Sequence, residues 1–235
     1  MTNGDTTKSK FIDELAPLAE KFKLPRNHPE LLGYELLCDL CRHHPSHQDD
    51  NEIVSKIWLI GRAYAAAIER RKKHRNIGSD EFYHRVVVKS FKHSKLDERL
   101  NSLRDYTEVT EDNVLEILKV HKYLVDLIKK ITGLEKRSLA SKYLHFHRPE
   151  LFLMYDSRAA SVLRKAPKLS KSSAKIIDNS HVDSVYASFC CRALELKNLI
   201  ETHVHRKLTL REFDCILIDR ANQKQKKRLR AGLPR

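Results

Sequence analysis

An aspartate that opens a helix, with lysines on the helix before it, is the arrangement in this chain best suited to chemistry. Asp156 follows the apolar run 151–155 and precedes the helical pattern 157–164. A buried carboxylate there can stabilise a developing positive charge or activate a nucleophile. Lys142, with Lys136 in reserve, can supply an amine that becomes nucleophilic when its pKa is lowered. These three residues are the candidate catalytic groups.

The elements that must position these groups are helices. Apolar residues recur at helical spacing over 111–131, and a turn at Gly133 follows. The pattern 138–147 predicts a second, shorter helix, which Pro149 ends because proline cannot continue a helix. Similar patterns along the chain predict an all-α, compact multi-helix fold of about ten helices, one of them over 50–73.

This order of elements resembles the helix–hairpin–helix superfamily of DNA glycosylases, which includes the 8-oxoguanine glycosylases. The resemblance covers about 50 of the 235 residues. It implies a hairpin that binds a DNA phosphate, a base flipped out of the duplex, and Asp156 as the catalytic carboxylate. The sequence departs from the family at two positions. Glu135 replaces the second hairpin glycine, and Arg137, which cannot act as an amine nucleophile, stands at the family's lysine spacing.

The resemblance and the side-chain chemistry also suggest residues that contact the nucleic acid. The expected backbone and base-edge contacts are Gly133, Arg137, His145, His147, Arg148, Arg158 and Arg164. The expected wall of the base pocket consists of Phe146, Phe152 and Tyr155. Each has a structural alternative. An aspartate in this position can serve only as a helix cap, the lysines can be solvated, and the histidines and aromatic residues can belong to the core.

The charge of the chain favours a polyanionic partner. Its 45 Lys and Arg exceed its 31 Asp and Glu by 14, and its pI is about 9.6. Two basic runs, 70–75 and 224–230, can follow a phosphate backbone and make binding dependent on salt. Double-stranded DNA is therefore the expected partner, and protein partners stay open.

Other classes of site find little support. Cys38 and Cys41, near His44 and His47, have zinc-ligand spacing, but they fall on one apolar helix face, which favours buried thiols. We expect no metal and no cofactor. The five cysteines and the polar first residues favour a cytoplasmic location, and no apolar run is long enough to cross a membrane. No phosphate-binding or dinucleotide-binding glycine motif occurs.

The expected organisation is a disordered segment 1–9, one helical domain 10–221 with its glycosylase-like core at about 110–165, and a basic tail 222–235. The expected function is base excision from DNA by a carboxylate, with or without a lysine amine. Two alternatives remain. One is a nucleic-acid-binding module without catalysis, which Glu135 and Arg137 favour. The other is a helical interaction protein of a bacterial defence or repair system.

Overall fold

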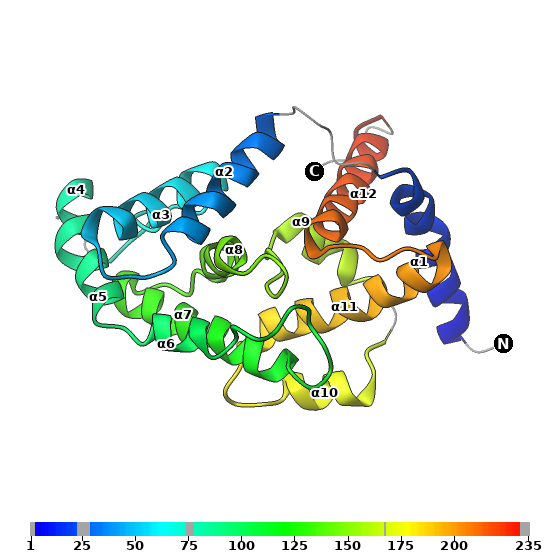
Figure 1. The fold of residues 1–235 in the computed structure, drawn as a ribbon. Coiled ribbons are helices and arrows are strands. Elements are labelled where there is room, and N and C mark those ends of the chain that lie inside the picture. Colours follow the sequence, from blue (N-terminus) through cyan, green and yellow to red (C-terminus); the bar gives the residue numbers. More distant parts are fainter. Residues whose placement is uncertain (1–2, 23–28, 74–77, 167, 231–235) are drawn as a thin grey trace. The chain divides into compact units, whose positions relative to one another are not determined.

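A computed structural model of the chain describes residues 3–22, 29–73, 78–166 and 168–230 (Figure 1). Over these ranges the chain forms helices and no strand. The all-α prediction is therefore confirmed, because apolar side chains recur at helical spacing along most of the sequence.

The helices group into two compact units. Unit 1 comprises residues 1–24, 155–179 and 184–235, and unit 2 comprises residues 25–154 and 180–183. The single domain expected over 10–221 stays a prediction, and each unit is described by itself.

Unit 2 contains the predicted hairpin and the helices around it. Its elements are α2 (Pro29–His43), α3 (Asp50–Ala63), α4 (Ser79–Phe82), the π-helical turn η1 (Tyr83–Val87), α5 (Val88–Lys92), α6 (Leu96–Asn101), α7 (Val114–Thr132) and α8 (Arg137–His147). Helix α8 packs against α2, α3 and α7, and α6 packs against α7. One apolar core unites these helices, so α8 is surrounded by the rest of the unit.

Helices α7 and α8 are joined as the sequence predicted, by a glycine in the left-handed conformation. One face of α7 is buried along its length, including Ile117, Leu124 and Ile128. Gly133 then adopts a φ of 77°, and its N–H donates to the carbonyl of Lys129 at 2.7 Å. A residue with a Cβ is disfavoured in this conformation, which explains the glycine at the helix end.

Unit 1 contains the helix that follows the candidate aspartate. Its helices are α1 (Asn3–Lys21), α9 (Ser157–Leu163), α10 (Lys171–Ile177), α11 (Ser184–Val204) and α12 (Leu210–Arg230). Helix α9 packs on α12, and α1 packs on α11 and α12. No described helix has both the length and the apolar content needed to cross a membrane.

The predicted helix 50–73 ends early. Helix α3 stops at Ala63, and the chain folds back so that the N–H of Ala66 donates to the carbonyl of Gly61 at 2.8 Å. A Cβ on Gly61 would lie 3.0 Å from the Cα of Ala67. The glycine therefore permits a close backbone approach that periodicity alone does not reveal. As a result, residues 70–73 are not the end of a helix.

The ends of the chain are also more helical than expected. Helix α1 begins at Asn3, inside the segment predicted to be disordered, and α12 continues through Arg230, inside the predicted tail. Residues 222–230 are mostly Gln, Lys, Arg and Leu, which are good helix formers, so the helix continues into the basic run. Residues 1–2, 74–77 and 231–235, which include parts of the predicted lead-in, first basic run and tail, lie outside the described residues.

Candidate nucleic-acid interface

The hairpin of unit 2 lies against the first basic run of the sequence. The Nζ of Lys136 donates to the carbonyl oxygens of Arg70, 66 residues earlier, at 2.6 Å and of Ala67 at 3.3 Å. The backbone N–H of Lys73 donates to the carbonyl oxygen of Thr132 at 2.9 Å. These bonds hold the basic run at the point where α7 ends and α8 begins.

Gly133 provides room for this arrangement. The side chain of Lys73 lies over it, and a Cβ at this position would be 2.7 Å from the Cδ of Lys73. The glycine is therefore required both by its positive φ and by the close approach of Lys73.

The result is a group of cations around the hairpin, which we name the hairpin cluster. It has four exposed members, Arg70, Arg71, Lys73 and Lys129, and two half-buried members, Lys136 and Arg137. Burial lowers the pKa of Lys136; Glu69 opposes this shift, and the charges of Arg70 and Arg71 add to it. The guanidinium groups of the basic run are thus close enough to Lys136 to repel its charge, which means that cations are concentrated here.

Glu135, the residue that departs from the glycosylase pattern, is paired within the cluster. Its carboxylate accepts hydrogen bonds from Lys129 at 2.8 Å and from Arg137 at 2.7 Å. The hydrogen bond from Lys129 lowers the pKa of Glu135. The Nε of Arg137 lies 2.7 Å from both carboxylate oxygens of the buried Asp183. Three carboxylates, those of Glu69, Glu135 and Asp183, therefore lie close to six cations, and the cluster keeps an excess of positive charge.

The two candidate amines are engaged by acceptors inside unit 2. The Nζ of the buried Lys142 donates to the hydroxyl of Ser138 at 2.8 Å and to the carbonyl oxygen of Tyr64 at 3.3 Å. Lys136 donates to the carbonyls of Arg70 and Ala67. An amine that attacks a sugar must first leave its acceptors, because the nucleophile is the free lone pair. The catalytic role of either lysine stays a prediction.

The side chains expected near the base belong to the interior of unit 2. His145 is 1 % exposed; its Nδ1–H donates to the carbonyl of Phe152 at 2.6 Å, and its Nε2 accepts from the Tyr34 hydroxyl at 2.9 Å. Phe146 packs with its ring centroid 5.4 Å from that of Tyr34 and 5.2 Å from that of Tyr64. Phe146 and Phe152 are almost completely buried, so a base could reach them only after a rearrangement.

Arg148 fixes a loop of unit 2. Its terminal nitrogens donate to the carbonyl oxygens of Leu103 at 2.8 Å and Tyr106 at 2.6 Å, and its Nε pairs with Glu150. All three nitrogens of its guanidinium are thus used within the protein, and this leaves little capacity for a phosphate.

Asp156 lies in unit 1, where it is the N-cap of α9. Its carboxylate accepts from the backbone N–H of Arg158 at 2.8 Å and from the Arg158 side chain at 3.3 Å. The predicted helix cap is therefore present. Tyr155 packs edge-on against Phe189 with a centroid distance of 5.1 Å, and Arg164 is exposed at the end of α9.

Known proteins offer no guide to the chain. It matches no family model, no curated protein and no solved structure. A function for the chain must therefore be inferred from the contacts themselves.

The cysteine pair lies in the interior of unit 2. Cys38 and Cys41 are buried on α2, and burial raises the pKa of Cys41 to about 12. Among the described residues, no group of three or more His, Cys, Asp or Glu side chains is placed to hold a metal ion. His47 belongs to a largely buried polar group that the sequence did not predict.

We name this group the interior polar cluster; its members are His47, Lys56, Asp97, Tyr143 and His147. The Nδ1–H of His47 donates to Asp97 at 2.5 Å, and its Nε2 accepts from the Tyr143 hydroxyl at 2.7 Å. Lys56, which is 0 % exposed, donates to the carbonyl oxygens of His44 and Ser46, each at 2.6 Å.

Protonation in this cluster is fixed by burial and by these bonds. Burial lowers the pKa of His47 and of His147. Burial would raise the pKa of Asp97, but hydrogen bonds from the side chain and backbone of His47 lower it overall. The His47 ring is therefore neutral beside an ionised Asp97. His47, Lys56 and Tyr143 are buried, so the cluster supports the fold of unit 2, while the side chain of Asp97 is 34 % exposed at its edge.

Proposed function

We propose that the chain binds double-stranded nucleic acid, without base excision, through the hairpin cluster of unit 2. The observation that carries this proposal is the placement of the basic run 70–73 on the hairpin by Lys136 and Lys73. It gathers exposed cations from two distant segments at one turn. A phosphate backbone is the partner such a surface attracts, since each phosphate that is neutralised releases a counterion.

The start of α8 supports the same conclusion. The side chain of its N-cap residue, Lys136, makes no capping hydrogen bond, and the N–H of Ala140 donates to the carbonyl of Lys136. The preceding N–H groups of the first turn lack helical acceptors, and the positive end of the helix dipole favours an anion. A phosphate at this turn would meet both the backbone donors and the cations of the cluster.

The test is salt-dependent binding of a labelled duplex followed by fluorescence anisotropy. The variant Arg70→Gln/Arg71→Gln lacks two exposed cations. We expect the slope of log K against log salt concentration to be shallower by about two than in the wild type. The weakening should be similar for unrelated sequences, because phosphates carry no sequence information.

A matched double variant controls for net charge. Arg42 and Arg85 are also exposed in unit 2, and each is paired with a nearby carboxylate, Arg42 with Asp39 and Arg85 with Glu81. Arg42→Gln/Arg85→Gln loses the same charge at residues outside the hairpin cluster and should leave the slope near that of the wild type. Equal slopes for the two double variants would reject the hairpin as the binding surface.

Base excision is a second candidate, favoured by the place of Asp156. The residue opens α9, in keeping with the resemblance to the glycosylases, in which an aspartate opens the corresponding helix. Because both candidate lysines are hydrogen-bonded, a route that uses only the carboxylate fits the contacts better than one through an amine. Under this proposal Asp156 would stabilise the sugar cation as the base leaves.

Its test is base release from duplexes that carry a panel of modified bases, with borohydride added to trap a Schiff base. Asp156→Asn keeps a good N-cap and removes the charge, so the fold of α9 should survive while release is lost. Binding without release from any substrate by the wild type would reject base excision and leave the binding proposal intact.

A further inference from the structure

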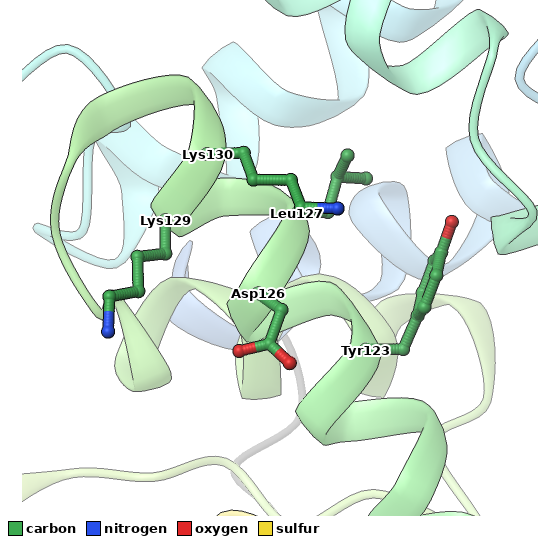
Figure 2. Close-up of a pocket in the computed structure, with 5 residues that line it drawn as sticks. All are labelled: Tyr123, Asp126, Leu127, Lys129 and Lys130. Carbon is green, nitrogen blue, oxygen red and sulfur yellow. The ribbon is translucent and has the colours of Figure 1, made fainter.

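A groove on α7 continues from the hairpin cluster. Two hollows of about 430 and 460 Å³ share Tyr123 and Asp126 and so form one groove along the helix. Figure 2 shows the five residues that line the larger hollow. Lys129 lines this groove and belongs to the hairpin cluster, while Lys130 extends beside Leu127 in Figure 2. Besides Leu127 and Lys129, and Ser180 and His181 from the segment before α11, the α7 groove is lined by charged and aromatic residues of α6 and α7: Arg99, Lys119, Lys122, Tyr123, Asp126 and Lys130.

Cations outnumber carboxylates in the α7 groove. Asp126 is the single carboxylate among the residues that line the groove, and it accepts a hydrogen bond from Lys122 at 2.5 Å. Lys130 is exposed and has no carboxylate partner within the described ranges. The six residues together carry an excess of three positive charges, and this excess favours an anionic occupant.

Arg99 lies in the groove with its guanidinium stacked on an aromatic ring. Its guanidinium carbon lies 4.4 Å from the centroid of the Tyr123 ring. The ring is itself fixed, because the Tyr123 hydroxyl accepts from the backbone N–H of Lys95 at 2.7 Å. The Nε of Arg99 is shielded from solvent and unbonded, and no carboxylate of the described chain pairs with the side chain.

A stacked guanidinium is already oriented, so less conformational entropy is lost when it binds an anion. Phosphate oxygens match its planar set of donors. The geometry of Arg99 on Tyr123 is therefore suited to hold a phosphate.

The length of the groove suits a strand rather than a single ion. From Lys119 to Lys130 the helix rises by about 16 Å at 1.5 Å per residue. That distance equals the rise of about five nucleotides of a duplex strand. Lys129, beside the Lys130 end of the groove, is paired with Glu135 of the hairpin.

We propose that one phosphodiester strand of the bound nucleic acid runs from the hairpin cluster into the α7 groove, where Arg99, stacked on Tyr123, binds a phosphate. This inference rests on the proposed binding function and extends its footprint. Acidic peptides are the competing occupants, and they lack the regular spacing of tetrahedral phosphates.

The experiment compares wild type, Arg99→Gln, Arg99→Lys and the control Arg85→Gln in salt titrations with a labelled duplex. We expect Arg99→Gln to weaken binding several-fold and to make the salt slope shallower by about one. Arg99→Lys keeps the charge but loses the stacked fork, so its affinity should be intermediate. Arg85→Gln should match the wild type. Thermal melts followed by circular dichroism establish that each variant is folded.

A second duplex, shorter by about ten base pairs, or one helical turn, tests the footprint. The difference in affinity between the two duplexes should shrink in Arg99→Gln, because the groove no longer holds the additional length.

The outcomes separate the two proposals. If Arg70→Gln/Arg71→Gln weakens binding and Arg99→Gln behaves as Arg85→Gln does, the hairpin stands and the groove proposal is overturned. If Arg99→Gln weakens binding while the Arg70/Arg71 variant does not, the hairpin proposal fails and the groove binds alone. Displacement of the duplex by polyglutamate of equal charge at equal concentration would overturn the phosphate assignment.

Discussion

The interior polar cluster and the hairpin cluster both contain charged side chains of unit 2, yet they differ in burial and in pairing. In the first, Lys56 and His47 are shielded from water and their polar groups find partners inside unit 2. In the second, Arg70, Arg71 and Lys73 are exposed. The comparison teaches that the number of charges in a segment says less about its role than their burial and pairing.

The two clusters should also respond to different variables. Charges in a low-dielectric interior interact strongly and are little affected by salt, so pH and substitution there should change stability. Exposed charges are screened, so ionic strength should control what binds at the hairpin. Changes of pH and single substitutions test this division between interior and surface charges. The largest changes in stability are expected from the interior polar cluster.

Acid should destabilise unit 2 through its buried histidines. Burial lowers the pKa of His47, His121 and His147, that of His121 to about 3 from an ordinary 6.5. Their stabilising contribution is complete above pH 6.5 and is lost as pH falls, because the unfolded chain then takes up the protons. Each should contribute a loss of about 1 kcal/mol per pH unit below 6.5.

The measurement is urea unfolding at a series of pH values, followed by the fluorescence of Trp58. It is the single tryptophan of the chain and lies in unit 2, so it reports on that unit. The lowered pKa of Asp97 extends the loss below pH 3.8. Constant stability between pH 6.5 and 4.5 would show that these histidines are not held neutral.

Removal of the buried lysine should destabilise unit 2 at neutral pH. Lys56→Met retains the volume but leaves the carbonyls of His44 and Ser46 without their donor. Loss of these bonds, offset in part by the relief of burying a charge, should lower the free energy of unfolding by about 2 kcal/mol. The matched variant Lys92→Met breaks a surface pair with Asp50 and should change it by about 0.5 kcal/mol or less. Equal effects of the two variants in urea unfolding would contradict the contrast between interior and surface.

The turn at Gly133 between α7 and α8 was predictable because the sequence signals that mark it are local. A long apolar stripe predicts α7, glycine marks its end, and proline ends α8. The cap at Asp156 was predictable for the same reason, since Asp is a preferred N-cap.

The companions of these residues were not predictable, because they come from distant segments. The sequence contains the run 70–73 as a basic stretch, but its position on the hairpin depends on the reversal at Gly61. The burial of His145 depends on Tyr34, 111 residues away. The partner of Arg137 is Asp183, 46 residues further along, and no pattern of charge marks that pair. Spacing therefore identified the turn, whereas tertiary packing determined which side chains surround it.

Gly133→Ala should disturb both stability and binding. The alanine must adopt a φ of 77°, and its Cβ would displace the Lys73 side chain. We expect a loss of about 1 to 2 kcal/mol in the free energy of unfolding and weaker binding of a duplex. The matched change Gly33→Ala lies on α2, where nothing is within 4 Å of the added Cβ, and it should be neutral or stabilising. Similar losses in both variants would argue against a specific requirement at the hairpin.

Glu135→Gln should change the free energy of unfolding least among these variants. It should strengthen binding of the duplex, whereas Gly133→Ala should weaken it. The pairs of Glu135 with Lys129 and Arg137 are on the surface, so their loss should change the free energy of unfolding by about 0.5 kcal/mol or less. The same change frees Lys129 and one terminal nitrogen of Arg137, which stays paired with Asp183, so the duplex should bind a few-fold more tightly, with a salt slope steeper by about one.

The control for this last variant is Glu81→Gln, which adds the same net charge and frees Arg85 outside the hairpin. Tighter binding in Glu135→Gln alone would mean that the hairpin carboxylate limits the affinity of the surface. Equal tightening in both would mean that only net charge matters, and the hairpin cluster would then have no special role. Because both variants are expected to retain their stability, the result bears on the surface alone and not on the interior of unit 2.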